Sequence, residues 1–202
     1  PAKLIEVVKM GTTVATNAVL ERKGARTVFL VNRGFADLLV IGRQSRPRLF
    51  DLHIQRPDPL YDRVIEVDGR VDLEGGTLTE LDEDSARTAL DQAKADGFEA
   101  CAISLLHAWK YPGFEARLGQ IAREAGFETV SLSHEADPLT GYVPRSATAV
   151  ADAYLSPVLG RYVEQVASRL GNTELHFMQS NGGLIEASNF RGRDAVLSGP
   201  AG

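Results

Sequence analysis

Apolar stretches alternate along this chain with longer segments in which apolar residues recur at the spacing of a helix. The apolar stretches predict strands at residues 4–8, 26–32, 98–106, 127–134 and 174–179. The helical spacing predicts helices at residues 12–22, 34–42, 81–97, 111–126 and 143–171. Strands that alternate with helices in this way are typical of an α/β fold with a mainly parallel sheet.

Residues 43–63 interrupt this alternation, because they are rich in proline and arginine and show no period. They predict a long irregular segment. The next residues, 63–72, alternate around Asp68 and Gly69, which predicts a β-hairpin with its turn at that pair. Both pieces are expected to form an insertion on one side of the sheet. Among the helices, Asp82 is expected to cap the one at 81–97. Gly24 is expected to end the one at 12–22.

Three segments share one pattern, in which an apolar stretch that predicts a strand is followed by glycine and other small residues. They are "VVKMGTTVATN", "HFMQSNGGL" and "AVLSGPAG". In open α/β sheets, ligands bind beyond the carboxyl ends of the strands, and backbone N–H groups at helix starts suit phosphate. The hydroxyls of Thr12, Thr13 and Ser180 add donors there. The three turns together favour an anionic ligand, although none matches the Walker or dinucleotide fingerprint.

Each of these turns also has a purely structural interpretation. Thr12 or Thr13 is a suitable cap for the helix that follows. Asn181, Gly182 and Gly183 form a good plain turn. The sequence alone leaves both interpretations open for each turn.

Two histidines follow neighbouring predicted strands. His107 ends the strand at 98–106, and His134, with Glu135 after it, ends the strand at 127–134. These side chains either line one cleft as acid, base or ligand, or bind loop backbone groups. The spacing is not that of a zinc site, so no metal is predicted. Cys101 lies inside an apolar strand and is expected to be a buried small hydrophobe rather than a nucleophile.

Arginines cluster in the irregular segment. Arg43, Arg46 and Arg48 lie there with Gln44. Such a cluster either clamps a carboxylate or phosphate, or forms a solvated loop that binds its own Asp51.

Composition narrows the class of protein further. The chain has 202 residues, enough for one large or two small domains. Its net charge of -5 gives no indication of a nucleic-acid partner, and no apolar run is long enough to cross a membrane. The single cysteine excludes an internal disulfide, and the N-terminus does not have the pattern of a signal peptide. A cytoplasmic location is therefore expected.

Both ends indicate an internal piece of a longer protein. The chain begins at Pro1 directly before a predicted strand and ends in the turn "LSGPAG". A lobe cut in this way is expected to expose sheet edges and apolar surface, and hence to associate or swap domains at high concentration.

Several motifs together resemble one known family. They are "GTTVATNAVLERKGARTVFLVNRGFADLLVIGRQSRPRLFDL", "SLLHAW", "SLSHE", "AYLSP", "MQSNGGL" and "LSGPAG". In this combination and order they resemble the hydantoinase A/5-oxoprolinase family, which includes the beta-type subunits of acetone carboxylase. The resemblance covers essentially the whole chain.

The resemblance implies an actin/Hsp70/sugar-kinase-like (ribonuclease H-like) lobe that is incomplete here. Residues 1–140 correspond to the N-terminal region of the family and residues 141–202 to the start of its core region. Two Asp-x-Gly-Gly-Thr phosphate loops belong to the family fold. The chain begins after the first loop and stops before the second. The piece alone is therefore expected to be inactive and not to bind ATP and Mg²⁺ tightly.

For the parent protein, the resemblance implies ATP hydrolysis, with Mg²⁺, coupled to opening a cyclic amide such as a hydantoin or a lactam. The implied partners are the cyclic amide or ketone substrate, a hydantoinase B-type subunit and the missing second lobe of the same chain. One alternative is the ATPase subunit of a ketone carboxylase acting on acetone or acetophenone. Another is a non-catalytic actin-like scaffold lobe.

The resemblance also assigns site residues by position in this sequence. The catalytic positions it implies are His107, His134 and Glu135. Substrate or phosphate binding is implied for Gly11, Thr12, Thr13, Asn17, Arg43, Arg145, Ser180, Asn181, Gly182, Gly183 and Gly199. Two departures stand out. Met10 occupies the position before the "GTT" turn, where family members usually carry histidine, and "GYVPR" replaces an Arg-Glu-Tyr-Glu-Arg-like stretch. Both fit a branch with a divergent substrate, such as a ketone carboxylase.

Overall fold

The computed structural model describes residues 5–43, 57–171, 173–196 and 198, and the chain divides into two compact units. Unit 1 comprises Pro1–Ala25 and Ala151–Gly202, and unit 2 comprises Arg26–Val150. The long helix α6 (Tyr142–Leu170) begins in unit 2 and ends in unit 1, and it runs through Pro157.

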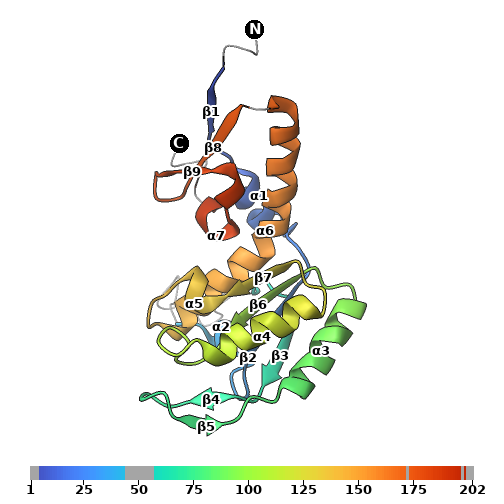
Figure 1. Ribbon diagram of the computed structural model, residues 1–202, viewed down its shortest axis with the longest axis vertical. Helices are drawn as coiled ribbons and strands as arrows, with labels where there is room; N and C mark the ends of the chain where they lie inside the picture. The colour runs from blue at the N-terminus through green and yellow to red at the C-terminus, as the bar shows by residue number, and fades with distance from the viewer. Residues whose placement is uncertain (1–4, 44–56, 172, 197, 199–202) are drawn as a thin grey trace, which may run out of the picture. The chain divides into compact units, whose positions relative to one another are not determined.

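A four-stranded parallel sheet forms the centre of unit 2 (Figure 1). Its strands lie in the order β3 (Arg63–Val67), β2 (Thr27–Asn32), β6 (Ala100–Ser104) and β7 (Thr129–Leu132). Every residue of β2 and β6 is buried, as expected for the inner strands of a sheet that is covered on both faces. The predicted α/β class with a mainly parallel sheet is confirmed.

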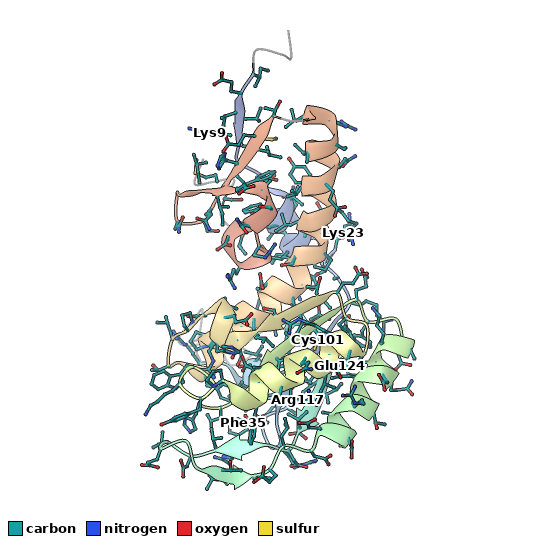
Figure 2. All side chains as sticks on the ribbon, viewed as in Figure 1. Lys9, Lys23, Phe35, Cys101, Arg117 and Glu124 are labelled. Atoms are coloured by element: carbon teal, nitrogen blue, oxygen red, sulfur yellow. The ribbon has the colours of Figure 1, made fainter. Side chains whose placement is uncertain are left out.

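Helices α3 (Glu83–Ala95) and α4 (Gly113–Glu124) cover one face of this sheet. Their apolar faces share a core with inward residues of β2 and β6, among them Leu30 and Ile103. Ion pairs of Arg117 with Glu83 and of Arg87 with Glu124 connect the two helices at their surface (Figure 2). The predicted cap of α3 is confirmed, because the Asp82 carboxylate accepts a hydrogen bond from the Ser85 N–H at 3.0 Å.

The other face of the sheet packs against the first residues of α6. Ser104 on β6 and Ser146 on α6 share a hydrogen bond of 2.7 Å between their hydroxyls. Phe29 on β2 stacks on Tyr61 with ring centroids 5.4 Å apart. Short helices α2 (Leu38–Ile41) and α5 (Ser133–Ala136) follow β2 and β7 within the same unit. Unit 2 is thus a layered α/β sandwich, and the carboxyl ends of its strands share one edge.

The predicted hairpin with its turn at Asp68 and Gly69 is wrong, although a hairpin follows directly after these residues. Strand β3 pairs in parallel with β2 instead, and the hairpin is formed by β4 (Arg70–Val71) and β5 (Thr77–Thr79). The Asp72 carboxylate closes its turn by accepting hydrogen bonds from the N–H groups of Glu74 and Gly76. The alternating pattern was misleading because a half-buried edge strand and a hairpin strand share the same period.

Unit 1 contains a smaller sheet of three strands. Strand β8 (Glu174–Met178) lies between β1 (Val7–Met10), which is parallel to it, and β9 (Leu184–Glu186), which is antiparallel. Phe177 stacks on Phe190 at 4.8 Å between ring centroids and anchors the core of this unit. Helices α1 (Val14–Leu20) and α7 (Gly192–Ala195) and the 3₁₀ turn η2 (Ala187–Asn189) complete it.

Two local predictions in unit 1 are wrong. The apolar stretch before "SGPAG" is not a strand, because residues 192–195 form α7. Side chains of α6 cap this helix: Asp152 accepts from the Arg193 N–H, and Ser156 accepts from the Gly192 N–H. Gly24 does not end α1, since the helix stops at Leu20. Gly24 instead allows close packing, because a Cβ there would lie 2.1 Å from the Tyr154 ring.

Some expectations fall on residues that the structure does not describe. Most of the irregular segment predicted at 43–63 lies there, since residues 44–56 are outside the described ranges. Gln44, Arg46, Arg48, Asp51 and Gly199 are among these residues. In the part of the chain that is described, no helix is long and apolar enough to cross a membrane.

Cys101 provides a direct test of how tightly unit 2 is packed. It is the chain's single cysteine, it is 0% exposed in β6, and burial raises the pKa of its thiol. We expect the native chain to resist alkylation by iodoacetamide near neutral pH and the denatured chain to react completely, because the thiolate is the reactive form. Mass spectrometry of the modified protein measures this. Rapid labelling of the native chain would contradict the packing described here.

Candidate functional site

Two of the glycine-containing turns lie at the same edge of the sheet in unit 1. Strands β1 and β8 are parallel neighbours, with Met10 paired to Phe177. The turn after β1 begins at Gly11, and the turn after β8 contains Ser180. Because parallel neighbours end at the same edge, the two turns leave the sheet side by side.

The third segment joins these two turns through hydrogen bonds. Ser198 Oγ donates to the carbonyl oxygen of Thr12 at 2.8 Å, and Thr16 Oγ1 donates to that of Val196. The N–H and the hydroxyl of Ser180 both donate to the carbonyl oxygen of Asp194, at 2.6 and 2.8 Å. We call residues 11–13, 180–183 and 194–198 the turn cluster, Leu197 being outside the described residues. The three segments that the sequence singled out therefore meet in space.

Several hydroxyls of the turn cluster are already used by the protein. The Ser180 and Ser198 hydroxyls donate to backbone carbonyls, so they are not available as donors to a ligand. Thr12 is buried, and its Oγ1 accepts from the Val14 N–H at 3.2 Å, although the N-cap position of α1 belongs to Thr13. Asn181 Oδ1 accepts from the Gly183 N–H at 2.8 Å, so this turn supports itself. These bonds support the structural interpretations of the two turns, and ligand binding there stays a prediction.

Exposed groups remain on the turn cluster beside these internal bonds. Gly11 and Thr13 are exposed, and Asn17 on the first turns of α1 is exposed as well. Thr13 makes no side-chain hydrogen bond at the start of α1. Gly182 has a φ of 83°, a conformation that favours glycine. Backbone and hydroxyl groups of this kind suit an anion, while the buried groups keep their positions fixed.

The carboxyl edge of the sheet in unit 2 is organised by Glu115, which sequence reasoning missed. Its side chain is 0% exposed, although it belongs to the first turn of α4. Oε2 accepts from the Leu105 N–H at 2.8 Å and from the Ser133 hydroxyl at 2.9 Å. Oε1 accepts from the N–H of His134 at 2.9 Å. One carboxylate thus connects the residues that follow β6 and β7.

Glu115 also fixes the ring of His134. The Nδ1 of His134 lies 2.7 Å from Glu115 Oε1, so Nδ1 carries the proton and donates it to that oxygen. The other nitrogen, Nε2, lies 3.9 Å from an oxygen of the exposed Glu135. A neutral imidazole held in this way presents Nε2 as a proton acceptor. The arrangement is suited to acid–base chemistry at that atom.

Arg145 lies inside the protein rather than on a surface. Its side chain is 0% exposed, and it donates to Ser133 Oγ at 2.8 Å and to the carbonyl oxygens of Leu105 and Leu139 at 2.6 and 3.2 Å. Burial lowers the pKa of Arg145, and the charge of Glu115 opposes this shift. Because the side chain is fully buried, a ligand reaches Arg145 only if the residues that cover it move.

A second buried network, also missed from the sequence, adjoins the first. Asn32 ends β2, and its Oδ1 accepts from the Leu106 N–H at 2.6 Å. The Tyr142 hydroxyl donates to the carbonyl oxygen of Ser104 at 3.1 Å. Burial raises the pKa of Tyr142, so its proton is firmly held. These bonds join the ends of β2 and β6 to the start of α6.

A sequence signal for Glu115 did exist. The buried face of α4 includes Leu118, Gly119 and Ala122, three, four and seven positions after Glu115. A carboxylate on an apolar helix face needs buried donors, and strand ends are where free backbone donors lie.

The remaining predicted positions, His107 and Arg43, lie outside these hydrogen-bond networks. His107 follows β6 with a φ of 65°, which is uncommon outside glycine, and its side chain makes no hydrogen bond within the described part of the chain. Strands β6 and β7 are neighbours, so both histidines lie at one sheet edge. Arg43 is exposed at the end of the described segment 5–43. Across the described ranges, no group of three or more His, Cys, Asp or Glu residues is arranged to hold a metal ion.

Comparison with known proteins identifies the family. Residues 2–126 match the hydantoinase/oxoprolinase N-terminal region, and residues 145–202 match the hydantoinase/oxoprolinase family model. The chain belongs to the hydantoinase/oxoprolinase family. The predicted boundary at residue 140 falls between the two matches and stays a prediction.

Individual relatives are also clear. The chain is 40% identical to the 5-oxoprolinase of Saccharomyces cerevisiae over 98% of its own length. It is 33% identical to caprolactamase subunit alpha of Pseudomonas jessenii over 95% of its length. The crystal structure of the ATP-dependent caprolactamase from that organism covers all of this chain with a TM-score of 0.88 and 30% identity. A nucleotide-free acetone carboxylase shares the fold, with a TM-score of 0.83 at 24% identity over 97% of the chain.

This chain spans only part of each of these proteins. It covers 18% of the yeast 5-oxoprolinase and 29% of caprolactamase subunit alpha. It covers 31% of the solved caprolactamase chain and 30% of the acetone carboxylase chain.

Glu115 is expected to be essential for the stability of unit 2. In Glu115→Gln, an amide N–H₂ faces donors such as the Leu105 N–H, and an unsatisfied buried donor destabilises by about 2 kcal/mol. Glu115→Ala removes the carboxylate from all the groups that donate to it and leaves the charge of Arg145 uncompensated. The free energy of unfolding should therefore fall by about 3–5 kcal/mol. Urea unfolding measures both losses. Glu128→Gln, on an exposed carboxylate, is the control and should stay near the parent chain. Equal stability of Glu115→Ala and the control would contradict this role.

Asp194 is expected to give unit 1 an unusual dependence on pH. Burial, assisted by the charge of Asp152, raises the pKa of Asp194. The native state therefore holds this proton more tightly than the unfolded state, so the free energy of unfolding falls as pH rises above the ordinary aspartate pKa.

The Asp194→Asn variant has no proton to lose at this position. The free energy of unfolding of Asp194→Asn, relative to the parent chain, should therefore increase between about pH 4 and pH 7. Thermal or urea unfolding across this range measures the difference. Asp84→Asn, at an exposed position, controls for the loss of one charge. A difference that is constant with pH, or that decreases, would be inconsistent with a raised pKa.

Proposed function

We propose that this chain is part of an ATP-dependent enzyme that opens a cyclic amide. The observation that carries this proposal is the match of the whole chain to the ATP-dependent caprolactamase, with a TM-score of 0.88 at 30% identity. The 40% identity to a 5-oxoprolinase supports the same reaction class. Caprolactam and 5-oxoproline are both lactams, so the two relatives share the bond that is broken.

An amide is a poor electrophile, so its ring does not open readily in water. ATP, with Mg²⁺, supplies a phosphoryl group that activates the amide oxygen when it is bound. The protein has to position that anionic group and to move protons as water adds and the ring C–N bond breaks. The products are the ring-opened amino acid, ADP and phosphate.

The turn cluster of unit 1 is our candidate for contact with the anionic group. Its exposed members, Gly11 and Thr13, offer backbone and hydroxyl groups, and Asn17 adds an amide. The bonds from residues 194–198 hold this turn in place, so little reorganisation is needed when charge arrives. Gly11, Thr12 and Thr13 carry no acidic group with which to hold Mg²⁺, and the acidic residue of the turn cluster is Asp194.

His134 is our candidate for proton transfer. Glu115 fixes its tautomer through Nδ1, which leaves Nε2 to accept or return a proton. Glu115 itself is buried and acts as a positioning residue. The catalytic role of His107, at the same sheet edge, stays a proposal, because its half-buried side chain has no fixed partner among the described residues.

The proposed partners follow from the family. The name caprolactamase subunit alpha says that this relative belongs to a multi-subunit enzyme. We propose that the protein carrying this chain likewise works with a hydantoinase B-type subunit on a small-molecule substrate. The proposed compartment is the cytoplasm, which a single buried thiol fits.

One observation favours a second function, the ATPase part of a ketone carboxylase. Met10 ends β1 directly before the turn cluster and has no group that transfers protons. A site without a proton donor at that position fits a substrate other than a hydantoin or 5-oxoproline. The third possible function is that of a non-catalytic, actin-like scaffold lobe.

Phosphate release by the full-length protein with its B-type partner tests these alternatives. The substrates are 5-oxoproline, caprolactam and hydantoin in one series, and acetone or acetophenone with bicarbonate in the other. We expect a cyclic amide to stimulate release from ATP and Mg²⁺, with one ring-opened product per phosphate by mass spectrometry. Stimulation by a ketone with a carboxylated product would support the second function. No stimulation by any substrate would support the lobe without activity. The 202-residue chain alone should release no phosphate.

In the same assay, His134→Gln should lower kcat by about a hundredfold with little change in KM, because general acid–base catalysis contributes about that much. Glu128→Gln, at an exposed residue directly before β7, is the control and should have no effect. An unchanged kcat in the folded His134→Gln enzyme would show that His134 does not transfer the proton, and the proposed type of reaction would still stand.

A further inference from the structure

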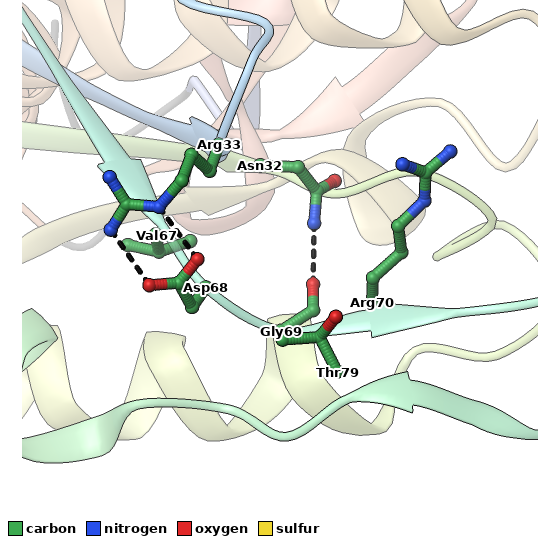
Figure 3. A pocket seen from close by; sticks show the side chains of 7 residues that line it. All are labelled: Asn32, Arg33, Val67, Asp68, Gly69, Arg70 and Thr79. Carbon is green, nitrogen blue, oxygen red and sulfur yellow. Dashed lines mark hydrogen bonds and ion pairs between the residues drawn. The ribbon is translucent and has the colours of Figure 1, made fainter.

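A cavity of about 200 Å³ lies at the carboxyl ends of β2 and β3 in unit 2 (Figure 3). It is lined by Asn32, Arg33, Val67, Asp68, Gly69, Arg70 and Thr79. None of these residues belongs to the turn cluster, and none is a predicted catalytic or binding position. The cavity is smaller than typical sites for drug-sized ligands, which are about 300–1,000 Å³, so it suits a small molecule.

The shape of the cavity is fixed by the backbone at Gly69. Its φ of 134° favours glycine, and a Cβ there would lie 2.8 Å from a methyl carbon of Leu81. Asn32 Nδ2 donates to the carbonyl oxygen of Gly69 at 2.5 Å, which ties the end of β2 to the start of β4. Because of this bend, Arg70 and its cross-strand partner Thr79 stand beside the sheet edge.

The charges around the cavity are not balanced. Asp68 is the one acidic residue in its lining, and Arg33 binds both of its oxygens at 2.7 Å. That ion pair lowers the pKa of Asp68 and neutralises its charge. The Arg70 side chain makes no hydrogen bond or ion pair with any other described residue. Figure 3 shows its guanidinium apart from the Arg33–Asp68 pair, on the side of β4 where the Asn32 side chain lies.

The polar groups that line the cavity are mainly donors. The Arg70 guanidinium has five N–H groups in a planar fork. Asn32 has a second amide N–H beside the one used by Gly69, while its Oδ1 already accepts from the Leu106 N–H. The Thr79 hydroxyl is exposed and makes no hydrogen bond within the described residues. Free donors around one uncompensated positive charge form a complementary surface for an oxyanion.

We propose that this cavity is a binding site for a small oxyanion, a carboxylate or a phosphate group. Arg70 forms a two-pronged salt bridge with the anion, and Thr79 and the second N–H of Asn32 bind its remaining lone pairs. The Arg33–Asp68 pair keeps the only carboxylate of the wall from repelling the ligand. The proposal does not depend on the proposed enzymatic function, since none of its residues is used there.

Titration of the 202-residue chain at low ionic strength tests the site. The probes are acetate, malonate and inorganic phosphate, with chloride as the anion that lacks oxygen. We expect saturable binding by calorimetry and a shift of the Arg70 Nε–H resonance in NMR spectra. Tighter binding of acetate and malonate identifies a carboxylate site, and tighter binding of phosphate identifies a phosphate site. No saturable binding of any of the three, or equal binding of chloride, would overturn the proposal.

Substitutions decide whether Arg70 is responsible. Arg70→Gln should weaken binding at least about tenfold, because it removes the charge-assisted pair. The affinity of Arg70→Lys should lie between those of the parent chain and Arg70→Gln, because lysine keeps the positive charge but lacks the planar guanidinium fork. Arg33→Gln should also weaken binding, because it leaves Asp68 uncompensated. Arg123→Gln, on the exposed surface of α4, is the matched control and should bind as the parent chain does. If Arg70→Gln binds the anion with unchanged affinity and its circular dichroism spectrum matches that of the parent chain, the proposed role of Arg70 is wrong.

Discussion

A single buried carboxylate holds the carboxyl ends of two neighbouring strands, β6 and β7, together. Glu115 reaches from α4 to donors after β6 and after β7, so the two strand ends keep fixed positions relative to each other. Arg145 lies behind it and supplies positive charge through Ser133. A buried carboxylate is tolerated only when its lone pairs are satisfied and its charge is compensated. The orientation of His134 depends on this arrangement.

The two compact units carry different chemistry. In unit 1, internal hydrogen bonds use up the serine hydroxyls and leave exposed backbone, threonine and asparagine groups on the turn cluster. In unit 2, the buried carboxylate of Glu115 fixes the ring of His134. Farther along the same sheet edge, Arg70 lines a cavity. In both units the buried polar groups fix the positions of the exposed ones, which is how a rigid scaffold supports a site.

The sequence predicts the elements whose pattern is set locally and fails where a distant contact decides. The inner strands β2 and β6 are continuous apolar stretches, and Asp82 is a cap that its own helix reveals. Helix α7 could not be predicted, because its caps come from Asp152 and Ser156 on another helix. The pattern of α4 places Glu115 on its apolar face, but the donors that it binds lie ten, eighteen and nineteen positions away, and no local pattern identifies them.

The bond between Ser198 and Thr12 joins residues 186 positions apart, and unit 1 is built from both ends of the chain. Closing so long a loop is entropically unfavourable, whereas the contacts of unit 2 close within 125 consecutive residues. During synthesis, the four strands of the sheet in unit 2 therefore emerge before β8, the strand that pairs with β1 in the described part of the chain. The pairing of β1 with β8, and with it the turn cluster, is therefore completed only after unit 2 has been synthesised.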